Sequence, residues 1–176
     1  LLPRFDGTQA LELLVKEKCT VFMGVPTMYI ALIEAAKTSE LRPQLKIALS
    51  GGAALPVPVL ERFAEVFGTH VLEGYGLTET SPVATFNQKG FEPKPGTVGK
   101  AIWGVEVEVA KAEIDERIEL LPPGELGEIV VRGHNIFKGY LNKPDATAAA
   151  IVDGWFRSGD LGDKDADGYV RILDRK

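Results

Sequence analysis

Several residue types and patterns are scarce in this chain of 176 residues, and each scarcity excludes a class of protein. The single cysteine, Cys19, has no second cysteine to pair with, so the fold is not a disulfide scaffold and fits a reducing, cytoplasmic environment. Only two histidines are present, His70 and His134, which argues against a histidine-based zinc site and against a Ser-His-Asp triad. No apolar run approaches the roughly 18 residues that a transmembrane helix needs, and we expect no signal peptide.

An excess of charge of one sign is also lacking. The net charge is −5, with acidic and basic residues interspersed, so we expect neither nucleic acid nor an anionic membrane surface as a partner. Hydrophobic residues make up 45% of the chain and charged residues 26%, which is an ordinary globular composition. The length allows one substantial core or two small ones.

The two ends predict a piece of a longer protein. The sequence starts at Leu1 without a methionine and stops at Lys176, within what the pattern indicates is an unfinished strand or turn. We therefore expect the chain's partners to include missing N-terminal and C-terminal parts of its own parent. Proteolytic processing would leave ends of the same kind.

Helical and strand patterns alternate in the first half. Helices are predicted where apolar residues recur with helical spacing or follow a proline, and strands where short β-rich runs stop at glycines. The predicted helices cover residues 8–18, 26–37 and 56–67, and the predicted strands cover 20–23, 46–50 and 70–72. Such alternation predicts right-handed crossovers and a mainly parallel sheet, with ligands bound beyond the carboxyl ends of the strands. The loops 51–54 and 74–76 follow consecutive strands, which predicts a site at these loops.

The pattern changes after about Asn87. Residues 90–99 are rich in glycine, proline and charge and predict a connector. Beyond it, short strands separated by turns predict a small β-barrel or a twisted antiparallel sheet. The strands are expected at 103–109, 127–133, 136–141, 155–158 and 169–173, with a short helix at 144–151. In the first of these strands, strict alternation predicts that Trp103, Val105, Val107 and Val109 share the buried face. The predicted fold class is therefore α/β, with a parallel βαβ layer in residues 1–90 followed by a smaller β-barrel-like subdomain in residues 91–176.

One stretch, residues 72–82, carries groups suited to a nucleotide site. Gly74 and Gly76 flank Tyr75, so the backbone can turn there and a flat ligand can lie against the ring. The hydroxyls of Thr78 and Thr80 and the carboxylate of Glu79 follow, and these groups suit a phosphate and its Mg²⁺. On local chemistry alone, a buried strand followed by a polar turn is an equally good interpretation, with Tyr75 as a core tyrosine.

The motif Gly74-Tyr75-Gly76-Leu77-Thr78-Glu79-Thr80 resembles the signature of the adenylate-forming (AMP-binding) enzymes, which include acyl-CoA synthetases, aryl-CoA ligases, luciferases and peptide-synthetase adenylation domains. Further segments match the same family in the same order. They are Gly24-Val25-Pro26-Thr27, Gly51-Gly52-Ala53-Ala54-Leu55-Pro56, Gly124-Glu125-Leu126-Gly127-Glu128, Gly139-Tyr140, Trp155-Phe156-Arg157-Ser158-Gly159-Asp160, Gly168-Tyr169 and Asp174-Arg175. Each motif alone is weak evidence, but their common order along the whole chain identifies the chain as a member of the family.

The resemblance implies a role for each matched residue. It implies that Tyr75 stacks on adenine and that Thr78 contacts the α-phosphate, while Glu79 holds Mg²⁺. Asp160 would accept both ribose hydroxyls, and Arg175 would also reach the ribose. The small residues that would let adenine or the acyl group approach closely are Gly51, Gly52, Ala53, Gly74 and Gly76. Without the resemblance, a helix cap or turn would be the default interpretation of Asp160.

The resemblance implies a parent enzyme that is an AMP-forming acid–thiol ligase. It would use ATP and Mg²⁺ to activate a carboxylic acid, by preference a fatty acid, as the acyl-adenylate and would transfer the acyl group to CoA. Two family parts are absent from this sequence: the phosphate loop with its lysine, and the C-terminal lid domain with its catalytic lysine. We therefore expect the isolated piece to be inactive. The acyl chain length and the oligomeric state are not predicted.

Two other classes of function remain as alternatives. The first is an aryl- or amino-acid-adenylating enzyme, and the second is a non-catalytic nucleotide- or calcium-binding module. The calcium alternative comes from Asp163-Lys164-Asp165-Ala166-Asp167-Gly168, which with Asp174 nearly fits an EF-hand loop. Strand-like flanks and a final Asp in place of Glu instead favour a solvated acidic hairpin turn.

Overall fold

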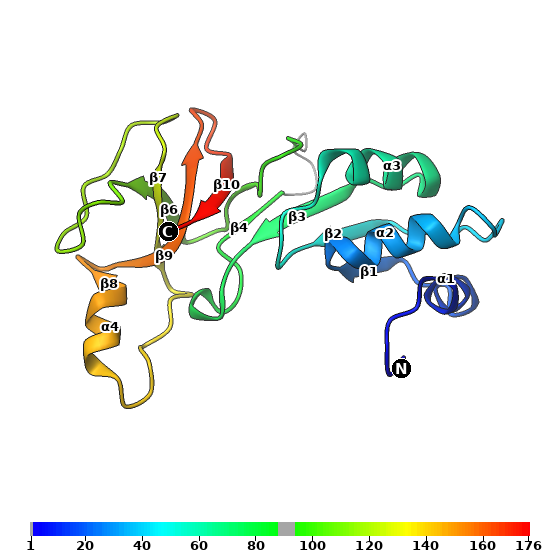
Figure 1. The fold of residues 1–176 in the computed structure, drawn as a ribbon, viewed down its shortest axis with the longest axis horizontal. Helices are drawn as coiled ribbons and strands as arrows, with labels where there is room; N and C mark the ends of the chain where they lie inside the picture. Colours follow the sequence, from blue (N-terminus) through cyan, green and yellow to red (C-terminus); the bar gives the residue numbers. More distant parts are fainter. Residues whose placement is uncertain (1, 88–93) are drawn as a thin grey trace. The chain divides into compact units, whose positions relative to one another are not determined.

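The computed structural model describes residues 2–87 and 94–176 (Figure 1). The chain forms two compact units, Leu1–Glu73 and Gly74–Lys176. The domain boundary predicted near residue 90 lies outside the described residues and stays a prediction. Across the two described ranges, no helix is both long and apolar enough to span a bilayer.

The first unit alternates helices with strands, as its sequence pattern predicts. Its elements are α1 (Gly7–Lys16), β1 (Val21–Gly24), α2 (Pro26–Ala35), β2 (Ile47–Ser50), α3 (Val57–Phe67) and the start of β3 (Val71–Tyr75). The helix ends follow local chemistry. The carboxylate of Asp6 accepts a hydrogen bond from Gln9 N at 2.9 Å and so caps α1, and Gly68 ends α3 with a φ of 68°.

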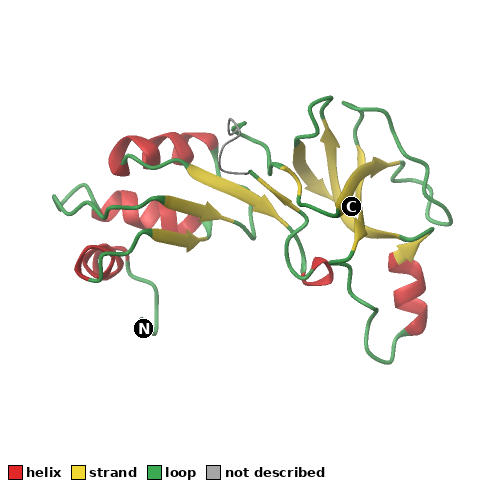
Figure 2. Cartoon of the chain, turned by 180° about the vertical axis from the view of Figure 1, so that it is seen from behind, coloured by secondary structure: helices red, strands yellow, loops and turns green. Residues whose placement is uncertain are grey.

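The strands of the first unit form a parallel sheet in the order β1-β2-β3, with Phe22 opposite Ala48 and Ala48 opposite Val71. These three side chains pack into the core that the helices cover. At its centre, Tyr29 contacts Phe22 and Phe63 edge to face, with ring centroids 5.3 and 4.9 Å apart. Figure 2 shows the helices of this unit beside its strands.

The opposite face of the same sheet is poorly covered. Val21 and Met23 of β1 are 51% and 72% exposed, and Val25, directly after the strand, is 40% exposed. Residues Ile47 and Leu49 of β2 lie opposite Val21 and Met23 in the parallel register, so they share this face. We call this surface, made by Val21, Met23, Ile47 and Leu49, the open sheet face. Parallel sheets are normally covered on both faces, so this one is unusual.

The second unit is mostly antiparallel. It contains Gly74 and Tyr75 at the end of β3, the 3-10 helix η1 (Thr78–Thr80), β4 (Thr85–Phe86), β5 (Lys100–Ala101), β6 (Val105–Ala110), β7 (Gly127–Gly133), α4 (Pro144–Ala150), β8 (Ile151–Val152), β9 (Trp155–Lys164) and β10 (Val170–Arg175). The order β10-β9-β7-β6 forms a sheet, and β8 pairs with β9. The predicted fold class, a parallel βαβ layer followed by a β-rich subdomain, is confirmed.

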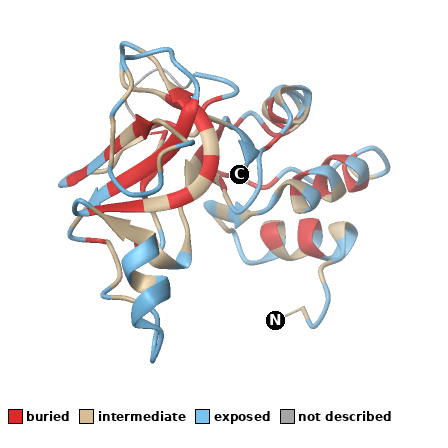
Figure 3. Cartoon of the chain, turned by 60° about the vertical axis from the view of Figure 1, so that its left-hand side comes forward, coloured by how far each residue is buried: buried red, intermediate tan, exposed pale blue. Residues whose placement is uncertain are grey.

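The core of the second unit lies on its long strands. Val105, Val107 and Val109 of β6 are buried, as the alternation in the sequence predicts, and they pack with Ile129 and Val131 of β7. Figure 3 shows buried residues concentrated on the strands, whereas α4 contains no buried residue.

Three details differ from the sequence predictions. Trp103 was predicted on the buried face but is 92% exposed, because it precedes the strand at a turn where Gly104 has a φ of 74°. Residues 136–141, predicted as a short strand, form a loop. The strand predicted at 155–158 continues to Lys164, because Gly159 allows a φ of 73° within it and β10 pairs with the continuation.

The acidic turn that nearly fits an EF-hand loop joins β9 to β10 and has no flanking helices. The Asp165 carboxylate accepts hydrogen bonds from the backbone N–H groups of Asp167 and Tyr169, and Asp163 pairs with Arg171. Within the described ranges, no cluster of three or more His, Cys, Asp or Glu residues could hold a metal ion. The structure therefore favours the solvated hairpin turn over calcium binding.

Candidate functional site

The glycines around Tyr75 are required by the fold of the second unit. Gly74 pairs with Phe86 of β4, and a Cβ added at Gly74 would lie 2.6 Å from the Phe86 ring. A Cβ at Gly76 would lie 1.8 Å from the carbonyl oxygen of Pro82. The chain itself therefore occupies the space that a side chain would need. The close approach of a ligand at these glycines stays a prediction.

Tyr75 and Asp160 come together although they are 85 residues apart. The Tyr75 hydroxyl donates to Asp160 Oδ2 at 2.5 Å, and Arg175 Nε lies 3.5 Å from Asp160 Oδ1. Burial, followed by the hydrogen bond to Asp160, raises the pKa of Tyr75 well above its usual range, so the phenol stays protonated. Three of the residues predicted to bind nucleotide therefore form one cluster.

Strand β7 fixes the segment of β9 that presents Asp160. Ser158 Oγ donates to the carbonyl oxygen of Ile129 at 2.7 Å and accepts from Asp160 N at 3.0 Å. Glu128 Oε1 accepts from Gly159 N at 3.1 Å. Asp160 is 8% exposed, so its carboxylate is held in a defined position rather than free in solvent.

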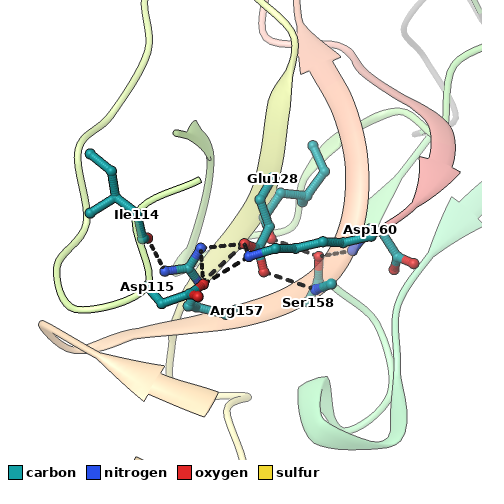
Figure 4. A network of polar contacts seen from close by, with 9 residues as sticks. Ile114, Asp115, Glu128, Arg157, Ser158 and Asp160 are labelled. Atoms are coloured by element: carbon teal, nitrogen blue, oxygen red, sulfur yellow. Dashed lines mark hydrogen bonds and ion pairs between the residues drawn. The ribbon is translucent and has the colours of Figure 1, made fainter. Parts of the chain in front are cut away.

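Glu128 in turn belongs to a buried polar network (Figure 4). Its Oε2 lies 2.5 Å from Arg157 Nη2, and both side chains are buried, at 2% and 6% exposure. Arg157 also donates to the carbonyl oxygen of Ile114, and Lys176 Nζ donates to Asp115 Oδ1 at 2.8 Å. The sequence alone indicates no role for Glu128 or Arg157, and their spacing along the chain gives no signal that they meet.

The groups of η1 divide into one structural and two accessible residues. The Thr80 hydroxyl is fully buried and bonds within the turn, donating to the carbonyl oxygens of Leu77 and Pro82. The side chain of Thr78 is exposed. Glu79 is partly exposed, and its Oε1 accepts a hydrogen bond from the Tyr140 hydroxyl at 2.8 Å. That hydrogen bond is also the largest cause of a raised pKa at Tyr140.

The glycine-rich loop of the first unit follows β2. Gly52 has a φ of 81° and open space around its Cα, with the nearest side-chain atom, in Val25, 3.8 Å from an added Cβ. Gly51 is half-buried and Ala53 is exposed. The loop leads to Leu55, whose N–H donates to Glu73 Oε1 at 3.1 Å.

Glu73 is a buried carboxyl that the sequence analysis left without a role. It is 5% exposed in the middle of β3, and burial raises its pKa despite the hydrogen bond from Leu55. The hydroxyl of Ser50 lies opposite Glu73 in the parallel register and is buried without a hydrogen-bond partner among the described residues. The available signal in the sequence was a carboxylate directly after the apolar residues Val71 and Leu72.

The second unit supplies only some of the ligands that a magnesium ion needs. Glu79 offers one carboxylate, and among the described residues Tyr140 is its only side-chain hydrogen-bond donor. Mg²⁺ usually keeps several waters and binds through one or two carboxylates plus substrate phosphates, so a single carboxylate beside the exposed Thr78 suits a nucleotide-bound ion.

Among known proteins, curated CoA ligases match nearly the whole chain. The long-chain-fatty-acid–CoA ligase of Bacillus subtilis (strain 168) is 42% identical over 100% of this chain and 31% of its own length. The feruloyl-CoA synthase of an Amycolatopsis species is 38% identical over 97% of this chain and 34% of its own length. The chain thus spans about a third of the length of these relatives.

Solved structures give the same result. ATP-bound MatB from Rhodopseudomonas palustris matches with a TM-score of 0.88 and 37% identity, over 99% of this chain and 34% of that one. A malonyl-CoA ligase in a ternary product complex with methylmalonyl-CoA and AMP matches with a TM-score of 0.84 and 42% identity, over 99% of this chain and 37% of that one. The family of AMP-binding enzymes matches residues 1–141, and this chain belongs to that family.

Proposed function

We propose that the complete protein carrying this chain is an ATP-dependent acyl-CoA synthetase. The observation that supports this most is the cluster of Tyr75, Asp160 and Arg175, which brings together residues from three family motifs. The relatives named above are CoA ligases, and one solved relative holds AMP together with an acyl-CoA. The two proposed substrates besides the acid are ATP and CoA.

The proposed reaction has two steps. In the first, a carboxylate oxygen of the acid attacks the α-phosphorus of ATP, the bond from that phosphorus to the bridging oxygen breaks, and pyrophosphate leaves. In the second, the sulfur of CoA attacks the acyl carbon, the bond to the AMP oxygen breaks, and the thiol proton passes to solvent. Neither step needs an oxidant or a reductant.

The residues of the second unit would act by positioning and electrostatics. Asp160 would accept the ribose hydroxyls, with Arg175 beside it, and Tyr75 would offer its ring to adenine. Thr78 would donate to the α-phosphate. Glu79 would hold Mg²⁺, which offsets the repulsion between the attacking carboxylate and the phosphate. In the first unit, Gly51, Gly52 and Ala53 would line the path of the adenine or the acyl group.

We favour a fatty acid as the substrate, because the first-named curated relative is a fatty-acid ligase. Other relatives of this chain are named for other acids, such as ferulate and malonate, so aromatic and dicarboxylic acids are the competing substrate classes. The isolated chain, without the further parts that its longer relatives possess, is expected not to turn over.

The test is ATP–pyrophosphate exchange by the full-length protein with fatty, aromatic and dicarboxylic acids of graded size. Asp160→Ala is expected to weaken nucleotide binding by roughly one to two orders of magnitude, because a hydrogen bond to a charged group contributes about 1.5–3 kcal/mol. Asp167→Ala, on the exposed β9–β10 turn, is the matched control and is expected to behave as the wild type. Absence of exchange with every acid, from a folded protein, would refute the proposal.

A further inference from the structure

Residues 134–143, between β7 and α4, form a loop that contacts η1 through both backbone and side chains. We call these residues the bracket loop. We propose that Tyr140 of this loop is a positioning residue that orients the Glu79 carboxylate toward a nucleotide-bound divalent cation. This inference rests on the proposed function, since it deepens the role assigned to Glu79.

The bracket loop fixes the position of η1 through hydrogen bonds to the backbone of η1 and the residues that follow it. The Phe137 N–H donates to the carbonyl oxygen of Glu79 at 2.8 Å. The Asn135 side-chain amide donates to the carbonyl oxygens of Thr80 at 3.0 Å and Val83 at 2.8 Å. Asn135 is 7% exposed, so these bonds are shielded from water. The turn that carries Glu79 is therefore held from one side by a single loop.

Tyr140 reaches the Glu79 side chain from the same loop. Its hydroxyl donates to Oε1 at 2.8 Å, and Oε2 has no hydrogen-bond partner among the described residues. A phenol donor on one carboxylate oxygen fixes the orientation of the carboxylate and leaves the other oxygen for a cation. Outer partners of this kind orient metal ligands and typically contribute about 10–100-fold to metal affinity.

Tyr140 is itself held in place. Its ring packs against Phe137 with centroids 4.8 Å apart, and Phe137 packs against Phe156 of the core. The Tyr140 N–H donates to Thr147 Oγ1 at 2.9 Å, and its carbonyl oxygen accepts from Lys143 N at 3.1 Å. The hydroxyl is thus presented by a fixed ring, as pre-organisation of a ligand requires.

A purely structural role for the hydroxyl is the competing explanation. Tyr140 is 37% exposed, and the packing of its ring against Phe137 does not involve the hydroxyl. Removal of the oxygen alone is therefore expected to leave the fold intact. The two explanations differ in what Tyr140→Phe changes: metal affinity in one case, thermal stability in the other.

The experiment uses the full-length protein with Tyr140→Phe, and with Tyr169→Phe as the matched loss of a phenol oxygen on the β9–β10 hairpin. Two quantities are measured: Mn²⁺ binding in the presence of ATP, by electron paramagnetic resonance, and the Mg²⁺ concentration that half-saturates ATP–pyrophosphate exchange. Tyr140→Phe is expected to weaken Mn²⁺ binding and raise the half-saturating Mg²⁺ about 10-fold, with the rate restored at saturating metal. Tyr169→Phe is expected to change neither.

A double variant separates an action through Glu79 from a general loss. If Tyr140 acts through Glu79, adding Tyr140→Phe to Glu79→Gln lowers metal affinity no further. Equal Mn²⁺ affinity in wild type and Tyr140→Phe, or additive losses in the double variant, would overturn the inference. If the wild type binds Mn²⁺ with ATP but shows no ATP–pyrophosphate exchange with any acid, the proposed function fails, while the Mn²⁺ comparison still decides the role of Tyr140. If the wild type binds no Mn²⁺ with ATP, both the proposed function and this inference are overturned.

Discussion

The two units of this chain hold their candidate site residues by different means. In the first unit the core is apolar and aromatic, around Tyr29 and Phe63, and the candidate residues are small ones on an exposed loop. In the second unit the candidate groups include the charged side chains Glu79 and Asp160, and buried polar side chains such as Glu128 and Asn135 hold the segments that carry them. The first unit would contribute space for a ligand beside small residues, and the second would contribute fixed charges and hydrogen-bond donors. This difference predicts that comparable substitutions in the two units will fail for different reasons.

The largest effect is expected where the polar network of the second unit is broken. Glu128→Ala leaves Arg157 buried without its carboxylate, which is expected to lower the free energy of unfolding by about 3–5 kcal/mol. Urea denaturation of the full-length protein measures this loss of unfolding free energy. Replacing both partners, with Glu128→Leu and Arg157→Met, is expected to recover most of the loss. The exposed pair of Glu106 and Arg132 is the control, and Glu106→Ala should have a far smaller effect. Equal effects of Glu128→Ala and Glu106→Ala would show that burial of the network does not matter.

The next effect compares one glycine from each unit. Gly76→Ala would force its Cβ against the carbonyl oxygen of Pro82, which is expected to cost about 1–3 kcal/mol of stability through overpacking. Gly52→Ala meets only Val25, at an ordinary contact distance of 3.8 Å, and is expected to cost about 1–2 kcal/mol through its positive φ alone. Asparagine tolerates a positive φ, so Gly52→Asn should recover stability relative to Gly52→Ala, whereas Gly76→Asn should be at least as unstable as Gly76→Ala. Thermal unfolding of the four variants measures this; recovery at Gly76 would refute the steric explanation.

The smallest effect is expected in the pH dependence of folding stability, through one carboxyl group of the first unit. Because burial raises the pKa of Glu73 above its unfolded value, the neutral carboxyl is favoured in the folded state, and stability declines as pH rises through the folded pKa. Glu73→Gln keeps an oxygen that can accept from Leu55 N–H and removes the ionisation. The variant should therefore lose less stability than the wild type between pH 4 and pH 8 in urea titrations. A parallel pH dependence in both proteins would mean that Glu73 is not the titrating group.

Local patterns were sufficient to predict most of the elements. Proline and glycine marked the start of α2 and the end of α3, and alternation placed Val105, Val107 and Val109 in the core. The errors arose where tertiary pairing decides. The continuation of β9 past Gly159 depends on β10, and the two-residue strands β4 and β5 exist only through their pairing with β3 and each other.

The candidate site was predicted through family motifs rather than through spacing. No local pattern predicts that Tyr75 donates to Asp160 or that Tyr140 donates to Glu79, since each pair is more than 60 residues apart. The residues that hold the site were missed for the same reason. Glu128 and Arg157 are ordinary charges on strands in the sequence, and only the folded register of β7 and β9 brings them together.

The open sheet face has a practical consequence for anyone who handles this chain in isolation. Met23 and Val21 line the outer face of β1, an edge strand in the described sheet, and exposed edges with apolar side chains promote self-association. A preparation of the 176 residues alone is therefore expected to self-associate, so that the mean particle mass measured by light scattering rises with concentration. Met23→Lys should reduce this self-association without changing the helix-covered core, whereas the same change in the full-length protein should be harmful if another layer covers this face.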